Sequence, residues 1–381
     1  MARVLVLGGG FGGLAAAHEL RAALPSEDEV TLVASRDHFF VGFAKLWDLV
    51  GARALEDGTA RLDGLHRHGI DFVHADITSI DAGRREVDTT AGTLSADGML
   101  VALGAGYAAV HLDLLGPGAH NLYDATALPG IRRELEALEE GRIVVSVLGG
   151  PYLCPPAPYE ATLLLDEWLR DRGRRDRVDV AVSTPQALTL PVAGPDASGF
   201  LADQLAERDV RVLTEHRVEG VDHGRGLLRF AGQDDLEWSL LLGVPAAAPP
   251  AVLAGTALAG EGGWVHPDPH TFRTGFERVY AVGDCTQVPT AVAQLPKAGV
   301  FAEAAGKVAA RNLVADLHGG EGARFDGHGY CYLELPGQRV ATVSGDFYAE
   351  PRPDVRLSDP DTAAFRAKQR WERERLDAWL G

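Results

Sequence analysis

The N-terminal segment, residues 3 to 34, constrains the fold more than any other part of the chain. A strand-like run, "RVLVL", leads into "GGGFGG", and a helix-like "LAAAHELRAAL" and a second strand-like "EVTLVA" follow. The glycines Gly8, Gly10 and Gly13 have the spacing Gly-x-Gly-x-x-Gly. Between a strand and a helix, such glycines let the backbone approach a pyrophosphate that binds at the helix N-terminus. The pattern predicts a dinucleotide-binding βαβ unit in which Gly8, Gly10, Phe11 and Gly13 contact the cofactor.

The end of the second strand departs from the usual pattern of such units. An acidic residue normally holds the ribose there, and here the position is Ala34. Ser35 or Asp37, close behind it, is then the candidate to hold the ribose.

A second strand, helix, strand series follows in the middle of the chain, at residues 142–150, 159–173 and 177–185. After residue 261 the chain returns to a strand, "RVYAVGDC", and to a long helix expected over residues 294–317. This order predicts an α/β fold with two Rossmann-like domains of the glutathione-reductase type, the second inserted in the first. We expect a discontinuous first domain over residues 1–110 and 260–320, a second over 111–259, and a C-terminal interface segment over 321–381.

The charge balance limits the partners. With 54 Asp and Glu against 36 Lys and Arg, the formal net charge is -18, which argues against nucleic acid and against an anionic membrane surface. Three cysteines with no C-x-x-C spacing predict no metal or haem site. A core strand begins almost at the first residue and leaves no room for a signal peptide, so we expect a cytoplasmic protein.

The last segment, "DTAAFRAKQRWERERLDAWL", predicts a charged helix with a thin apolar side. That side carries Phe365, Leu376, Trp379 and Leu380, with Trp371 close to it. We expect it to pack on the body of the protein or in a homodimer, with at most peripheral contact to a membrane.

The strand "VYAVGDC" supplies a second cofactor motif. It ends at Gly283 and Asp284, and with the helix behind it resembles the motif by which flavoproteins with two dinucleotide domains bind the ribityl and pyrophosphate part of FAD. Asp284 can accept a hydrogen bond from a ribityl hydroxyl, and the helix N-terminus near Lys297 can stabilise negative charge on a reduced flavin. Gly104 and Pro296 complete the predicted FAD contacts.

The place of a second glycine-rich loop is taken by "GGPYLCPPAPYE", residues 149–160. Pro151 removes an N–H and bulky neighbours fill the space of a pyrophosphate, so a nicotinamide cofactor is disfavoured. Cys154 lies just before a helix that should start near Pro158. The positive end of that helix would stabilise a thiolate, whereas an isolated cysteine is by default a buried, inert one.

The strings "CPPAPYE", "QLPKAGVFAEA" and "CYLEL" resemble those of the flavoprotein subunit of flavocytochrome c sulfide dehydrogenase and, more broadly, of the sulfide:quinone oxidoreductases. The resemblance implies a redox-active disulfide between Cys154 and Cys331 over the flavin, with Cys331 nearer the ring. Cys285 matches no catalytic position, and we expect it to be structural. Glu160 is a candidate to shuttle a proton, or else only a charge at the helix N-terminus.

Two departures from the family refine this prediction. Residues 105 to 150 contain no further cysteine, so the two-cysteine pattern fits better, and "SRDHFFVGFAK" has no sulfur to link a flavin, so FAD should be non-covalent. Without a C-x-x-C-H haem motif, the electrons of sulfide, or of another small sulfur nucleophile, must go to a separate acceptor, a quinone or a redox protein.

Three other functions remain open at this point. An NAD(P)H:quinone-type dehydrogenase shares the architecture but needs the missing second loop. A persulfide or polysulfide reductase would use the same cysteines in the opposite direction. A non-catalytic flavoprotein would keep the fold alone.

Overall fold

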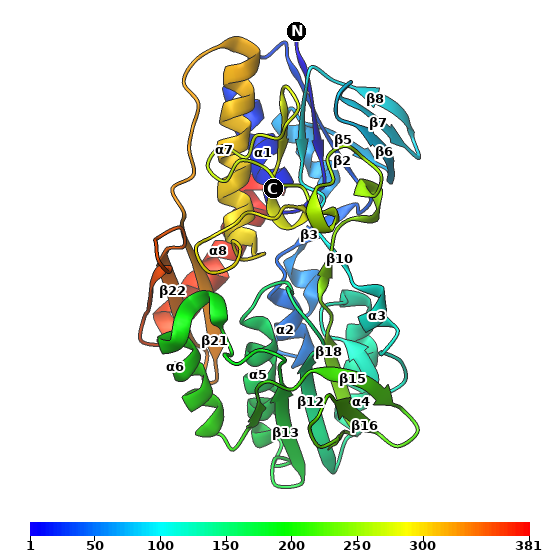
Figure 1. Cartoon of the computed structure of the whole chain (residues 1–381), viewed down its shortest axis with the longest axis vertical. Helices are drawn as coiled ribbons and strands as arrows, with labels where there is room; N and C mark the ends of the chain where they lie inside the picture. Colours follow the sequence, from blue (N-terminus) through cyan, green and yellow to red (C-terminus); the bar gives the residue numbers. More distant parts are fainter.

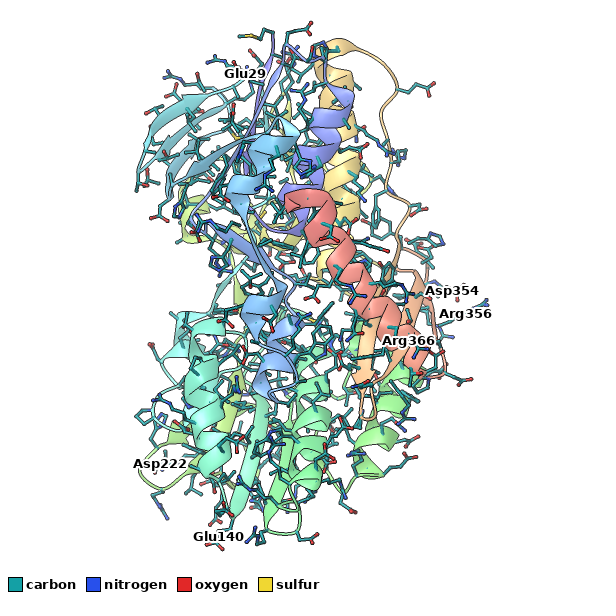
Figure 2. All side chains as sticks on the ribbon, turned by 180° about the vertical axis from the view of Figure 1, so that it is seen from behind. Glu29, Glu140, Asp222, Asp354, Arg356 and Arg366 are labelled. Carbon is teal, nitrogen blue, oxygen red and sulfur yellow. The ribbon has the colours of Figure 1, made fainter.

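Two parallel sheets, each covered by helices, lie one above the other along the long axis of the molecule (Figure 1). The computed structural model describes residues 1–381. Glu29 lies near one end of the long axis, and Glu140 and Asp222 near the other (Figure 2). The predicted α/β class with two Rossmann-like units is confirmed.

The first sheet has five parallel strands in the order β20-β9-β1-β2-β5. Their bounds are β1 (Arg3–Leu7), β2 (Glu29–Ala34), β5 (Asp71–His74), β9 (Gly98–Val101) and β20 (Val279–Ala281). The helices α1 (Phe11–Ala23) and α7 (Gly299–His318) lie side by side on one face (Figure 1). Because β20 comes from far along the chain, the polypeptide leaves this unit and returns to it. That return brings the Gly-rich loop and the motif around Asp284 to the same edge.

The other face of the first sheet is covered by antiparallel strands that share its apolar core. These strands are β6 (Ile77–Asp81), β7 (Glu86–Thr89) and β8 (Gly92–Ser95). Because both faces are covered, the central strand β1 consists almost entirely of buried apolar residues, as parallel strands between two layers do.

The second sheet also has five parallel strands, in the order β11-β18-β12-β13-β14. Their bounds are β11 (Ala119–Asn121), β12 (Gly141–Val147), β13 (Val178–Ser183), β14 (Arg211–Leu213) and β18 (Leu240–Val244). One face shares a core with α2 (Ala44–Leu49), α4 (Leu128–Ala137), α5 (Ala157–Asp171) and α6 (Gly194–Ala206). The other face packs on β15 (Val218–Asp222), β16 (Leu227–Phe230) and β17 (Leu236–Glu237).

The C-terminal segment forms an antiparallel sheet and one long helix. The sheet has β21 (His328–Leu335), β22 (Arg339–Asp346) and β23 (Asp354–Leu357), and the helix is α8 (Thr362–Leu380). In Figure 2, α8 runs from the three-stranded sheet to the first unit across the junction of the two units. Trp371 and Trp379 are buried, so the apolar side of this helix packs on the body of the protein.

One predicted boundary is wrong. The helix expected over residues 294–317 begins at Gly299, and the residues before it form a loop. Pro296 disfavours a helical conformation for the residue before it. Ala298, the residue before the helix, is extended, with φ -143°. Lys297 therefore lies in the loop, outside the helix.

The remaining elements are short. They are β3 (His38–Phe40), β4 (Thr59–Arg61), β10 (Gly106–Tyr107), β19 (Ala247–Ala248), α3 (Ala109–Leu112) and the 3-10 helices at Leu55–Gly58, Leu62–His68, Ala125–Ala127, Pro191–Ala193, Ala251–Leu253, Glu261–Gly263 and Gly283–Cys285. None of the helices combines the length and the apolar composition needed to cross a membrane.

Candidate active site

The Gly-rich loop forms a backbone cradle at the start of α1. Gly8 has φ +116°, and a Cβ on Gly8 or on Gly13 would come within 3.0 Å of a backbone atom, so side chains are excluded there. A Cβ on Gly10 would meet nothing within 4 Å, and the same holds for Gly104, which has φ +69°. Backbone N–H groups at a helix N-terminus with open space in front of them suit a pyrophosphate.

Phe11 opens α1, but its ring belongs to an aromatic cluster. The ring centroid lies 5.1 Å from that of Phe39, 5.4 Å from that of Trp371 and 5.8 Å from that of Trp379. Two of these partners are on α8, so the C-terminal helix supports the loop directly. The group of Phe11 that can bind a cofactor is therefore its backbone N–H, not its ring.

The two candidates for the ribose contact differ in their surroundings. Asp37 already binds His38 and Arg61, with each carboxylate oxygen 2.9 Å from a nitrogen. Ser35 is exposed; its carbonyl accepts a hydrogen bond from His74 at 3.0 Å, and its hydroxyl has no partner in the chain. The hydroxyl of Ser35 is therefore the freer group to hold a ribose.

A cavity next to the loop fits the second cofactor motif. Its lining includes Gly283, Asp284, Pro296, Lys297 and Phe301. Burial raises the pKa of Asp284, although the Lys297 ammonium lowers it, and the carboxylate accepts no hydrogen bond from the chain. A half-buried acceptor without a partner suits a ligand hydroxyl, so the residues present fit the ribityl part of FAD.

The side chain of Lys297 differs from the prediction. Its Nζ donates to the carbonyls of Asp284 and Thr286, both at 2.8 Å, and lies 3.8 Å from the centroid of the Trp264 ring. Burial lowers the pKa of this ammonium, while Asp284 raises it. The predicted helix start at Lys297 is thus corrected to a buried cation that joins two loops.

Cys154 lies directly beside this segment. Its backbone N–H donates to the carbonyl of Lys297 at 3.0 Å, which connects the second unit to the cavity of the first. Burial and the negative charge of Glu160 raise the pKa of the Cys154 thiol, Lys368 and Lys45 lower it, and the net value is about 12. The expectation that this sulfur is a thiolate is therefore wrong for the reduced form, because desolvation raises its pKa more than the nearby cations and the backbone N–H of Ala157 lower it.

Cys331, on β21, is half-buried like Cys154. Burial raises the pKa of its thiol, and negative charge on Cys154 and on Glu160 raises it further, so the two sulfurs lie within electrostatic reach of one another. Both are free thiols, and the implied disulfide is not formed. Cys285 is fully buried, with its sulfur against the carbonyls of Val101 and Val282.

Glu160 belongs to a buried charge cluster, which we define as Glu160, Glu334 and Lys368. The Lys368 Nζ donates to Glu160 Oε1 at 3.3 Å and to Glu334 Oε2 at 2.7 Å. Glu160 Oε1 also accepts the backbone N–H of Glu334 at 2.7 Å. Burial raises the pKa of Glu160, Lys368 lowers it and Glu334 raises it. A carboxyl group with a raised pKa beside two sulfurs can exchange protons with them.

Lys45, from α2, is a second buried cation near Cys154. Its Nζ donates to the carbonyl of Tyr123 at 2.6 Å, and the Tyr123 hydroxyl donates to the carbonyl of Leu153 at 2.7 Å. Lys45 forms no ion pair in the chain, and burial lowers its pKa to about 8 while Cys154 raises it. The ammonium is therefore anchored beside the loop that carries Cys154.

Protein side chains occupy the space beside the turn at Gly149, where a related enzyme would bind a nicotinamide cofactor. A Cβ on Gly149 would lie within 3.0 Å of the His111 ring, whose Nδ1 accepts the backbone N–H of Ala246 at 3.0 Å. The Pro151 carbonyl accepts the N–H of Ala247 at 2.7 Å. A pyrophosphate at this turn would have to displace the imidazole.

Sequence patterns did not reveal three of these charged residues, Lys45, Glu334 and Lys368. Glu334 follows Cys331 by three positions, and Lys368 is a single Lys on the apolar side of α8, next to the buried Phe365 and Trp371. A charge on the buried side of a helix is a signal that could have found Lys368.

Comparisons with known proteins show the family of the chain and its relatives. The model of the family described as pyridine nucleotide-disulphide oxidoreductase matches residues 2–299. The mitochondrial sulfide:quinone oxidoreductase of Mus musculus is 24% identical over 369 residues, 91% of this chain and 79% of that protein. The sulfide-quinone reductase of Aquifex aeolicus is 25% identical over 338 residues, 82% of this chain and 76% of that protein.

A solved structure extends the likeness to the fold. The X-ray structure of the sulfide:quinone oxidoreductase from Aquifex aeolicus has a TM-score of 0.88 at 23% identity, covering 98% of this chain and 90% of that chain. The similarity includes the C-terminal segment, which the family model does not reach.

Proposed function

The chain belongs to the pyridine nucleotide-disulphide oxidoreductase family, and we propose that it is a FAD-dependent enzyme that oxidises sulfide and passes the electrons to a quinone. The single observation that carries this proposal is that Cys154, within electrostatic reach of Cys331 and Glu160, contacts Lys297 in the lining of the cavity at the proposed ribityl site. The relatives named as sulfide:quinone oxidoreductases support the substrate and the acceptor.

The FAD site is formed by the Gly-rich loop, the hydroxyl of Ser35 and the motif around Asp284. The backbone N–H groups at the start of α1 would bind the pyrophosphate, and the Asp284 carboxylate would accept from a ribityl hydroxyl. When bound, FAD would supply a two-electron carrier between the sulfur chemistry and the acceptor. No sulfur lies near the end of β2, so we propose a non-covalent cofactor.

The sulfur step is a thiol-disulfide exchange. In the oxidised protein, hydrosulfide attacks one sulfur of a Cys154–Cys331 disulfide, a new S–S bond forms to the substrate sulfur, and the bond between the cysteines breaks. One cysteine becomes a persulfide and the other leaves as a thiolate that keeps the bonding electron pair. Glu160 accepts the proton that the substrate sulfur loses.

The filled loop at Gly149 argues for sulfide over NADH as the electron donor. The test is anaerobic stopped-flow mixing of the FAD-loaded protein with sulfide and, separately, with NADH. Sulfide should bleach the visible flavin band and NADH should leave it unchanged, and a water-soluble quinone should then restore the band. Bleaching by NADH and not by sulfide would contradict the proposal.

The location and the assembly are separate matters. The cytoplasmic location, the homodimer and the peripheral membrane contact stay predictions. Gel filtration at several concentrations tests the homodimer, and flotation with vesicles tests the membrane contact.

A further inference from the structure

The charge cluster of Glu160, Glu334 and Lys368 is almost completely shielded from solvent. The exposed fractions of its side chains are 2%, 4% and 1%. Each residue comes from a different element, α5, β21 and α8. The Lys368 Nζ also lies 4.5 Å from the centroid of the Phe43 ring, so its neighbours are two carboxylates and aromatic carbon. Two carboxylates share the one ammonium that is hydrogen-bonded to them.

Stability does not require this arrangement. Removing charges from water costs several kcal/mol for each ion, and well-packed apolar residues in the place of a buried ion pair are often as stable. The cluster lies near the two cysteines of the proposed mechanism: Glu334 follows Cys331 by three positions on β21, and Glu160 is in the first turn of α5, directly after the loop of Cys154. Negative charge on Glu160 accordingly raises the pKa of both thiols. The position of the cluster points to a role in proton exchange at these sulfurs.

Hydrogen bonds fix one oxygen of Glu160 and leave the other free. Oε1 accepts from Lys368 and from the backbone N–H of Glu334, whereas Oε2 has no hydrogen-bond partner in the chain. Glu334 is held differently, because the Trp47 indole N–H lies 3.0 Å from both of its carboxylate oxygens. Glu160 is therefore the member of the cluster with an oxygen available for a proton.

We propose that Lys368 is a positioning residue that keeps Glu160 as a carboxylate able to accept a proton, and that Glu334 opposes it. This role rests on the proposed function, in which a proton leaves the substrate sulfur as the new S–S bond forms. That proton goes to Glu160 Oε2, and Lys368 keeps its own. The C-terminal helix thereby controls the chemistry of a site to which it contributes no sulfur.

The surroundings of Glu160 give the direction of each effect. The titratable groups that face it are Cys154 on the preceding loop, Tyr123, Glu334 and Cys331 from β21, and Lys368 from α8. Lys368 is the cation among them. Burial alone would lower the pKa of Lys368, but the two carboxylates raise it above its usual value, so this group stays charged across the working range. Removing it favours protonated Glu160, and removing the charge of Glu334 favours ionised Glu160.

The test is the pH profile of flavin bleaching by sulfide in Lys368→Met and in Glu334→Gln. The acid limb, where Glu160 becomes protonated, should move to higher pH by about one unit or more in Lys368→Met. It should move to lower pH in Glu334→Gln. Arg366→Met is the matched control, because it removes an exposed positive charge from the same helix, at its outer edge (Figure 2), and should leave the profile unchanged.

A purely structural role would give a different result. Shifts in the same direction in both variants, or no shift in either, would overturn the proposal. If Lys368→Met does not fold, the pH profile of Glu334→Gln alone tests the proposal. The acid limb of that profile should move to lower pH, and an unmoved acid limb overturns the proposal.

A second readout does not depend on sulfide. The infrared band of a protonated buried carboxyl group, assigned through its loss in Glu160→Gln, follows the protonation of Glu160 directly. The midpoint of this band should move to higher pH in Lys368→Met and to lower pH in Glu334→Gln. If the midpoints move as expected but sulfide bleaches none of the proteins, the proposed function fails and only the control of Glu160 protonation by Lys368 stands. If sulfide bleaches the flavin and the midpoints do not move, the role of Lys368 fails alone.

Discussion

Replacing Gly306 by alanine should weaken the helix contact that supports the Gly-rich loop. A Cβ at Gly306, on α7, would come within 3.0 Å of the carbonyl oxygen of Gly12 and to 3.3 Å from the backbone nitrogen of Ala16, both on α1. Neither backbone atom can swing aside as a flexible side chain would. Ordinary contact begins at 3.4 Å, so the backbone of the two helices must move apart by about 1 Å at the Gly12 carbonyl.

Two opposing effects set the magnitude of the change. Overpacking of this kind costs about 1–3 kcal/mol, and alanine in place of glycine inside a helix gains about 1 kcal/mol. Gly199, on α6, is the matched control, because it is exposed and its Cβ would meet nothing within 4 Å. Both variants gain the same helix propensity, so the difference between them isolates the overpacking cost.

The assay is chemical denaturation of both variants together with FAD titration followed by flavin fluorescence. Gly306→Ala should be about 1–3 kcal/mol less stable than Gly199→Ala, and it should bind FAD more weakly because α1 carries the pyrophosphate cradle. Equal stability of the two variants, with unchanged FAD affinity, would refute the reasoning.

Three further predictions concern the active site. Cys154→Ser and Cys331→Ser should each keep FAD but lose anaerobic bleaching by sulfide, and retention of bleaching in both would contradict the cysteine pair. Lys45→Met should raise the pKa of the Cys154 thiol, because it removes one of the cations that lower this pKa. Alkylation of the reduced protein by iodoacetamide should then slow about tenfold for each unit by which the pKa rises. Lys45→Arg keeps the positive charge and should restore most of the alkylation rate. Asp284→Asn should weaken FAD binding about tenfold, the equivalent of one charge-assisted hydrogen bond, and unchanged affinity in a fluorescence titration would remove Asp284 from the site.

Local sequence patterns predicted the parts of the fold that depend on local physics. The first loop could be predicted from its glycines, because only glycine fits the positive φ of Gly8 and the close backbone approach at Gly13. The apolar strand runs identify buried parallel strands, since both faces of β1 and β12 are covered. These features produce the two Rossmann-like units.

Long-range contacts explain what sequence patterns missed. The contact of the Lys297 carbonyl with the N–H of Cys154 joins two units, and no local pattern announces it. The pKa of Cys154 was predicted from a helix dipole, whereas its value depends on burial that strands and helices far along the chain create. The charge cluster joins Glu160 to Lys368, which are 208 positions apart, and no local pattern contains such a pair.

The central claim is that Cys154 and Cys331 work as one redox pair beside the flavin. The most direct measurement is peptide mapping by mass spectrometry of the oxidised, FAD-loaded protein, before and after one equivalent of sulfide without oxygen. A disulfide linking the peptides of Cys154 and Cys331, lost as the flavin bleaches, is the predicted result. Two cysteines that stay free for alkylation in an oxidised protein that sulfide still bleaches would contradict it.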